Sequence, residues 1–281
     1  MKPPREHDLG LEYDLGTLRR RQVLSLFAGA GLVAVAGCAP DPAPSTSTTP
    51  ATSATPATST TPSTSSTPST STAGVDEIPA ETAGPYPGDG SNGPNVLTES
   101  GIVRSDITKS FGSASGTATG VPLTVELTIL DADKDTPLTG AAVYVWHCDA
   151  QGRYSLYSEG VTNENYLRGV QATDADGKIT FTTIFPAAYP GRWPHVHFEV
   201  YASLTEATAA GKISATSQLA FPENVCTAVY ATTGYDGSAD NLRRTPLADD
   251  NVFGDDDGVH QLAAVAGDAV KGYTARLTVG V

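Results

Sequence analysis

The sequence predicts an all-β domain, a sandwich or barrel of short strands, on three observations. Apolar and polar residues alternate from Leu123 to Ile129, the period-two pattern of a strand with one buried face. Turn residues such as Asp174-Ala175-Asp176-Gly177 separate the apolar runs. Only residues 204–210 favour a helix, and a short one. The other expected strands are residues 141–146, 178–185, 196–201 and 274–279.

The first 37 residues have the pattern of an export signal. Three arginines, Arg19 to Arg21, precede an apolar run from Val23 to Gly37, and Cys38 follows. The arginines resemble a twin-arginine signal, and Val-Ala-Gly-Cys resembles a bacterial lipobox in which Cys38 is lipidated. We therefore expect the chain at the outer face of a bacterial membrane or secreted. An uncleaved amphipathic anchor with an incidental cysteine is the alternative.

Residues 38–74 form the expected tether between this signal and a β domain at residues 75–281. From Ala39 to Gly74, 21 of 36 residues are Ser or Thr and seven are Pro, a composition that cannot build a core. The β domain carries 12 basic and 26 acidic residues, so its field disfavours nucleic acid. No apolar run reaches the 18 residues of a membrane span.

His195 and His197 are the first candidates for chemistry. In a strand, this spacing directs both imidazoles to one face, while Val196 points to the other. Two imidazoles about 7 Å apart along a strand can converge on one metal ion. Taken alone, the pair fits hydrogen-bonded structural histidines equally well.

Three motifs around these histidines resemble one family. They are W-H-x-D-x-x-G-x-Y-S from Trp146, R-G-x-Q-x-T-D-x-D-G from Arg168, and P-x-x-Y-P-x-R-x-P-H-x-H-F from Pro186. Together they resemble the intradiol ring-cleavage dioxygenases of the catechol and protocatechuate 3,4-dioxygenase type, from about Glu81 to the C-terminus. The resemblance implies a β-sandwich of short, mostly antiparallel strands with long active-site loops.

The resemblance also implies a non-haem Fe(III) ion, one per chain, bound by Tyr154, Tyr189, His195 and His197. Two phenolates suit a hard ferric ion, and two imidazoles complete an open site. An Fe(II) site of two histidines and a carboxylate would instead use Glu199, which lies on the histidine face of the strand. A copper or zinc site would leave the two tyrosines as coincidental.

The implied reaction cleaves a catechol-type substrate with O₂ between its hydroxylated carbons, giving a cis,cis-muconate-type diacid. Arg192 would stabilise negative charge on the bound ring, Gln218 resembles its partner, and Tyr189 would accept a proton as it leaves the metal. Tyr86 either lines the mouth of the site or packs as a loop aromatic. The sequence does not distinguish catechol, protocatechuate, hydroxyquinol and substituted catechols.

Other features carry weaker expectations. Cys148 and Cys226 are an even pair in an exported chain, which predicts a disulfide, with two buried thiols as the alternative. The acidic run at Asp249-Asp250 and residues 255–257 lacks EF-hand spacing and is interpreted as a solvated loop. With no dimerisation helix before the β domain, we expect a monomer or weak homo-oligomer. A non-catalytic surface module that binds carbohydrate or a wall polymer remains the alternative function.

Overall fold

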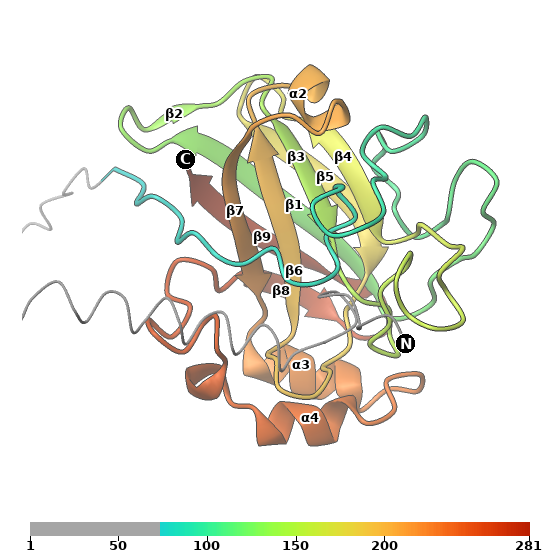
Figure 1. Cartoon of the computed structure of the whole chain (residues 1–281). Helices are drawn as coiled ribbons and strands as arrows, with labels where there is room; N and C mark the ends of the chain where they lie inside the picture. The colour runs from blue at the N-terminus through green and yellow to red at the C-terminus, as the bar shows by residue number, and fades with distance from the viewer. Residues whose placement is uncertain (1–73) are drawn as a thin grey trace, which may run out of the picture. The chain divides into compact units, whose positions relative to one another are not determined.

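The computed structural model describes residues 74–281, which form two β-sheets packed face to face (Figure 1). Residues 1–73 lie outside the described part, and with them Cys38, the expected signal peptide and nearly all of the expected tether. In the described part, no helix is long and apolar enough to cross a membrane.

The five-stranded sheet is built around β1, whose alternating pattern is that of the sequence. Leu123, Val125, Leu127 and Ile129 are buried, while the polar residues between them are partly exposed. Strand β1 runs antiparallel to β2 and β5 and parallel to β9, which pairs with β8. The strands are β1 (Pro122–Asp131), β2 (Thr136–Pro137), β5 (Lys178–Ile184), β8 (Ala264–Asp268) and β9 (Gly272–Gly280).

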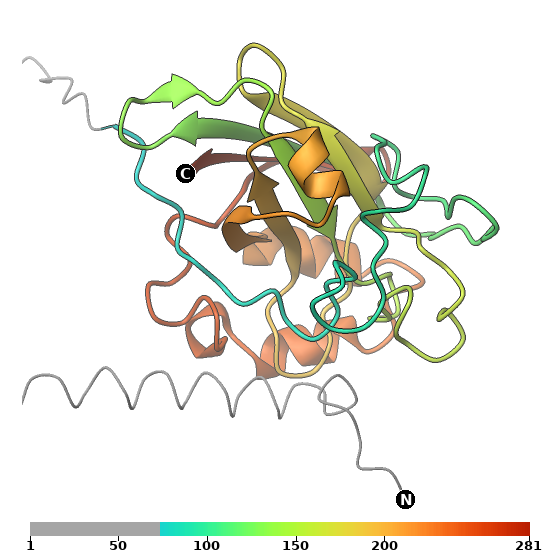
Figure 2. The same cartoon turned by 45° about the horizontal axis from the view of Figure 1, so that its top comes forward.

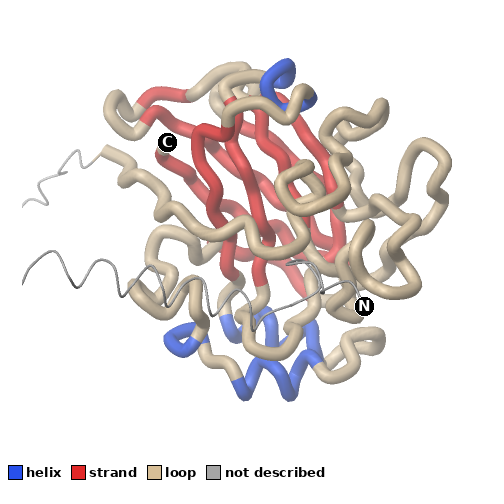
Figure 3. The backbone as a smooth tube through the Cα atoms, viewed as in Figure 1, coloured by secondary structure: helices blue, strands red, loops and turns tan. Residues whose placement is uncertain are grey.

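The four-stranded sheet is antiparallel, in the order β4-β3-β6-β7. Every residue of its two inner strands, β3 and β6, is buried. One face of this sheet packs on the other sheet, and loops cover the opposite face, as the tube view shows (Figure 3). The strands are β3 (Ala142–Trp146), β4 (Arg168–Ala172), β6 (His195–Tyr201) and β7 (Ile213–Ala220).

Short helices lie at the two ends of the sheets (Figure 1), and the turned view brings the helix at residues 204–208 forward (Figure 2). Helix α2 (Leu204–Thr208) follows β6, where the sequence predicted a short helix. Helices α3 (Glu223–Tyr230) and α4 (Ser238–Arg244), with a 3-10 turn at Leu247–Asp249, were not expected. They occupy the connection between β7 and β8.

The predicted all-β sandwich is confirmed, and so are the five predicted strands. Strands β1, β3, β5, β6 and β9 overlap these expected runs, with ends that differ by at most two residues. Strands β2, β4, β7 and β8 were not anticipated. Of these, β7 matters most for the site because it pairs with the strand that carries the two histidines.

Candidate metal centre

Strand β6 positions His195 and His197 on the face of its sheet that the loops cover. Val196 and Phe198 lie on the other face, in the apolar core. The Trp146 ring stacks on the His197 ring, with centroids 4.8 Å apart and planes within 4°. This stack fixes the orientation of the imidazole.

The two tyrosines come from loops. Tyr154 lies between β3 and β4 and is buried, and its backbone N–H donates to Ser158 Oγ over 2.9 Å. Tyr189 lies between β5 and β6, is half-buried, and precedes a turn at Gly191, whose φ of 84° favours glycine. The site therefore combines donors on a rigid strand with donors on two separate loops.

The four side chains direct their polar ends at one another. His195 Nε2 lies 3.1 Å from His197 Nε2, 3.1 Å from the Tyr189 hydroxyl and 3.5 Å from the Tyr154 hydroxyl. The two hydroxyls are 3.4 Å apart. The structure thus brings together all four residues that the resemblance named as ligands.

These spacings fit a single ion at the centre of the four atoms. Ligands about 2.1 Å from an ion and 3.1–3.5 Å from each other subtend roughly 95–113° at it. Such angles suit four-coordination or an open five-coordinate arrangement. The set of two phenols and two imidazoles can hold a hard trivalent cation.

The imidazoles are in the state that a metal requires. His195 Nδ1–H donates to the Trp193 carbonyl over 2.5 Å, which leaves the Nε2 lone pair directed at the cluster. Burial, and for His197 also the neighbouring His195, lowers the pKa of both imidazoles well below the usual value. Both rings are therefore neutral at pH 7.

The phenols need a cation to ionise. Burial raises the pKa of Tyr154 and Tyr189 above the usual value, and their mutual proximity raises that of Tyr154 further. The nearby Arg192 charge opposes both shifts. A bound multivalent cation supplies the missing stabilisation, because it favours the phenolate over the phenol.

Arg192 is buried beside this cluster and contacts Gln218, as the resemblance implied. Its Nη2 donates to Gln218 Oε1 over 2.7 Å, and Gln218 Nε2 donates to the Thr82 carbonyl over 2.9 Å. Gln218 pairs with His197 across the β6–β7 ladder. It therefore links the arginine to the segment that begins at Glu81.

Asp250 is a site residue that sequence reasoning missed, and its interpretation as part of a solvated loop is wrong. Its side chain is fully buried and pairs with Arg192 Nε over 3.0 Å. The partner lies 58 residues earlier in the chain, so no local pattern marks this aspartate. Its neighbour Asp249 is exposed, as expected.

Tyr86 packs on the ring of Tyr154, with centroids 5.1 Å apart, and is half-buried. Buried Arg168 holds this segment in place, because its guanidinium donates to the carbonyls of Tyr86 and Pro87 and to Ser155. One cation thus ties the segment around Tyr86 to the loop that carries Tyr154. The place of Tyr86 beside the Tyr154 ring fits either of the two roles expected for it.

The predicted disulfide is wrong, since Cys148 and Cys226 are free buried cysteines. Each thiol is directed at a different carbonyl: Cys148 Sγ lies 3.6 Å from the Ala187 oxygen and Cys226 Sγ 3.9 Å from the Phe221 oxygen. Burial raises the pKa of both thiols, so they stay protonated and inert.

Glu199 does not complete a two-histidine, one-carboxylate site. It is buried on the histidine strand, but its carboxylate accepts a hydrogen bond from the Tyr201 hydroxyl over 2.7 Å. Within residues 74–281, no three His, Cys, Asp or Glu side chains are grouped to hold an ion. The tyrosines are therefore required for any metal site at His195 and His197.

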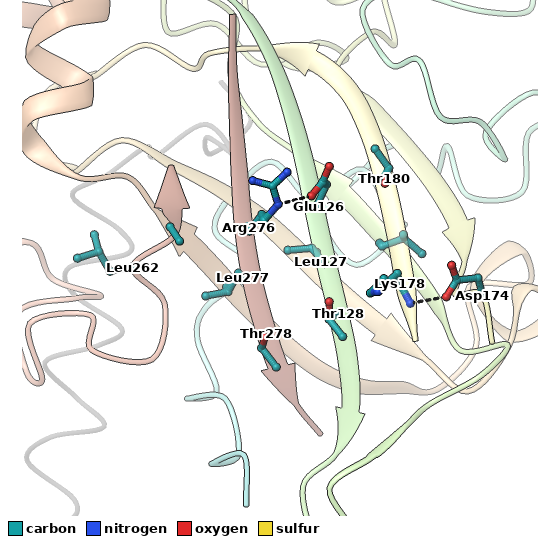
Figure 4. Close-up of a pocket in the computed structure, with 12 residues that line it drawn as sticks. Glu126, Leu127, Thr128, Asp174, Lys178, Thr180, Leu262, Arg276, Leu277 and Thr278 are labelled. Atoms are coloured by element: carbon teal, nitrogen blue, oxygen red, sulfur yellow. Dashed lines mark hydrogen bonds and ion pairs between the residues drawn. The ribbon is translucent and has the colours of Figure 1, made fainter. Parts of the chain in front are cut away.

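A hollow of about 660 Å³ lies away from these donors, on the five-stranded sheet (Figure 4). Its lining mixes polar and apolar side chains, and Arg276 on β9 pairs with Glu126 on β1 over 2.6 Å. None of the four donor side chains lines it. Its size does not make it the candidate site, because it lacks the convergent groups that chemistry needs.

Comparison with known proteins agrees with this geometry. Residues 92–204 match the Dioxygenase family model. This segment includes the four donors and Arg192 but neither Tyr86 nor Gln218. A structure titled intradiol ring-cleavage dioxygenase, from Tetranychus urticae, superposes with a TM-score of 0.58 at 25% identity, covering 73% of this chain and 94% of that one. The two-sheet architecture is the intradiol dioxygenase sandwich.

The curated relatives match over a shorter stretch. A chlorocatechol 1,2-dioxygenase of Rhodococcus opacus is 41% identical over 54 residues, 19% of this chain and 21% of that protein. A catechol 1,2-dioxygenase of Candida albicans is 39% identical over 54 residues, 19% of this chain and 18% of that protein. The matched stretch spans about a fifth of these relatives. The matches support the intradiol dioxygenase family.

Proposed function

We propose that this chain is an exported, Fe(III)-dependent intradiol dioxygenase that cleaves catechol-type aromatics between their hydroxylated carbons. The observation that carries the proposal is the convergence of two phenol oxygens and two imidazole nitrogens, with contacts of 3.1–3.5 Å. Tyr154, Tyr189, His195 and His197 would hold the iron. Bound there, Fe(III) would take up a catecholate and make its ring reactive toward O₂.

The chain's own residues would prepare the substrate. The phenolate oxygen of Tyr189 would accept a catechol proton, because this half-buried loop residue can move more easily than the buried Tyr154. Arg192 would stabilise the negative charge of the ring through its guanidinium. The neutral imidazoles would keep their places on the strand, and the buried surroundings would exclude water.

The test is the visible absorption spectrum and iron content of the purified full chain, before and after anaerobic addition of catechol. Tyrosinate bound to Fe(III) should give a broad red-brown band that shifts when catechol binds. Tyr154→Phe should remove or strongly weaken the band. Tyr157→Phe is the matched control, since that hydroxyl accepts from the Gly88 N–H and lies outside the donor set.

Product analysis after addition of O₂ identifies the reaction, with a cis,cis-muconate-type diacid as the expected product. A red-brown protein that gives no diacid from any catechol would refute the proposed dioxygenase activity. A protein that remains colourless after Fe(III) is supplied would favour the non-catalytic binding module. Tight zinc or copper binding without the coloured band would favour a zinc or copper site at the two histidines.

The export part of the proposal rests on the sequence from Arg19 to Cys38. Lipidation should place the chain in the membrane fraction, and Cys38→Ser should release it. An unchanged distribution would contradict the anchor. Monomer or weak oligomer is the corresponding proposal for assembly, and light scattering over a concentration series tests it.

A further inference from the structure

Asp250 makes more hydrogen bonds to the site than its position in an acidic run suggests. Its carboxylate accepts from Arg192 Nε over 3.0 Å and from Nη2 over 3.4 Å. It also accepts backbone N–H groups, from Trp193 over 2.6 Å, Val252 over 2.9 Å and Phe253 over 3.2 Å. One buried carboxylate therefore joins the arginine, the segment before His195 and its own loop.

These contacts determine which edge of the guanidinium is free. Asp250 and Gln218 occupy Nε and Nη2, so two neighbouring edges of the planar group are engaged. Within residues 74–281, Nη1 has no hydrogen-bond partner, and the guanidinium carbon lies 5.9 Å from the Phe253 ring, which also packs near His195. The two Nη1 hydrogens are thus available to a ligand.

We propose that Asp250 is a positioning residue that holds Arg192 with its Nη1 edge presented to the catecholate bound at the four donors. The inference rests on the proposed function. An arginine side chain has many rotamers, so a flexible guanidinium would stabilise developing charge poorly. The carboxylate removes that freedom before the substrate arrives. It also compensates a charge that burial would otherwise destabilise.

A second connection runs from Asp250 to a metal ligand. The backbone N–H of Trp193 donates to Asp250, and the backbone carbonyl of the same residue accepts Nδ1–H of His195. Asp250 therefore helps to hold in place the residue whose carbonyl orients the imidazole. Asp250 therefore acts on the arginine and on the orientation of one histidine through a single group.

The experiment compares Asp250→Asn with Asp249→Asn, the same substitution at the exposed neighbour, in the full chain loaded with Fe(III). We expect Asp250→Asn to bind iron and keep the coloured band but to lose on the order of 100-fold in kcat/KM, mainly in kcat. Asp249→Asn should behave as the wild type. Equal kinetics for the two variants, or a loss confined to KM, would overturn the inference.

Arg192→Met supplies the background that separates positioning from general stability. If Asp250 acts mainly through the arginine, adding Asp250→Asn to Arg192→Met should lower residual kcat by less than about tenfold, because only the effect on His195 remains. Both carboxylate oxygens also accept backbone N–H groups, so Asp250→Asn should lower the thermal midpoint in either background, but less in Arg192→Met, where the ion pair is already absent. If Asp250→Asn alone fails to fold, the kcat of this pair decides the question. A further loss of kcat near about 100-fold, or an equal loss of midpoint in both backgrounds, would contradict the proposal.

The proposed function and the positioning role of Asp250 can be refuted separately. Wild-type protein that binds iron but cleaves no catechol would refute the proposed function, and with it the role of Asp250 in that reaction. Active wild-type protein with Asp250→Asn indistinguishable from Asp249→Asn would refute the positioning role alone.

Discussion

His147 should make the stability of the protein sensitive to mild acid. The residue follows β3 and is buried. Its Nδ1–H donates to the Cys148 carbonyl over 2.8 Å, and its Nε2 accepts from the Thr183 hydroxyl over 2.7 Å. Burial lowers the pKa of His147 from 6.5 to about 4. The native ring is neutral over a range in which the unfolded chain takes up a proton.

The sign and size of the effect follow from this difference. Below about pH 6.5 the unfolded state binds a proton that the native state excludes, so the free energy of unfolding falls as pH falls. At about 1.4 kcal/mol per pH unit, the loss from His147 amounts to about 3 kcal/mol by pH 4. Above pH 6.5 this contribution to stability is fully present.

Urea unfolding of wild type and His147→Gln between pH 7 and pH 4 measures this contribution. The variant lacks the titrating ring, so the difference in unfolding free energy between the two proteins should shift by about 3 kcal/mol in favour of the variant as the pH falls. His260→Gln is the matched control, since that ring is partly exposed. A pH dependence that His147→Gln leaves unchanged would show that the ring is not held neutral.

Three further predictions concern the cysteines, a close backbone contact and a buried acid. Cys148 and Cys226 should each be alkylated after unfolding without reductant and resist alkylation in the native protein; a mass showing a disulfide would contradict two free thiols. Gly88→Ala should cost roughly 1–3 kcal/mol of unfolding free energy, because φ is +69° and the added Cβ would lie 2.7 Å from Arg168 Nη1; an unchanged urea midpoint would contradict this. Burial raises the pKa of Glu81 to about 7, so its native state keeps a proton that the unfolded chain loses above about pH 4.5. Stability should therefore fall as pH rises from 4.5 to 7, Glu81→Gln should reduce that fall, and parallel pH profiles would refute the assignment.

The strands were predictable because their signal is local. Alternation in β1 and the apolar composition of β3 and β6 follow from side chains that must be buried. Helix α3 gave a weaker signal, since it contains two valines and a threonine and begins after Pro222 without a side-chain cap. Helix α4 begins after Gly237, also without a side-chain cap.

Site residues that lie in sequence motifs were predictable, whereas a residue that joins the site only through tertiary contacts was not. Tyr154 and His197 lie in motifs with specific spacing, and the structure brings them together. Asp250 becomes a site residue only through its pairing with a distant arginine. The number of cysteines does not reveal where their thiols point, which is why the disulfide at Cys148 was wrong.

The division of the donors between strand and loops has a consequence for adaptability. His197 is held by hydrogen-bonded ladders on both sides of β6 and His195 by the ladder to β7, so their positions are tied to the stability of the whole domain. Tyr154 and Tyr189 belong to connections that can lengthen or change sequence without breaking a ladder. Selection or an engineer can therefore reshape the space above the imidazoles, and with it the ligand that the proposed centre accepts, while the two histidines remain unchanged.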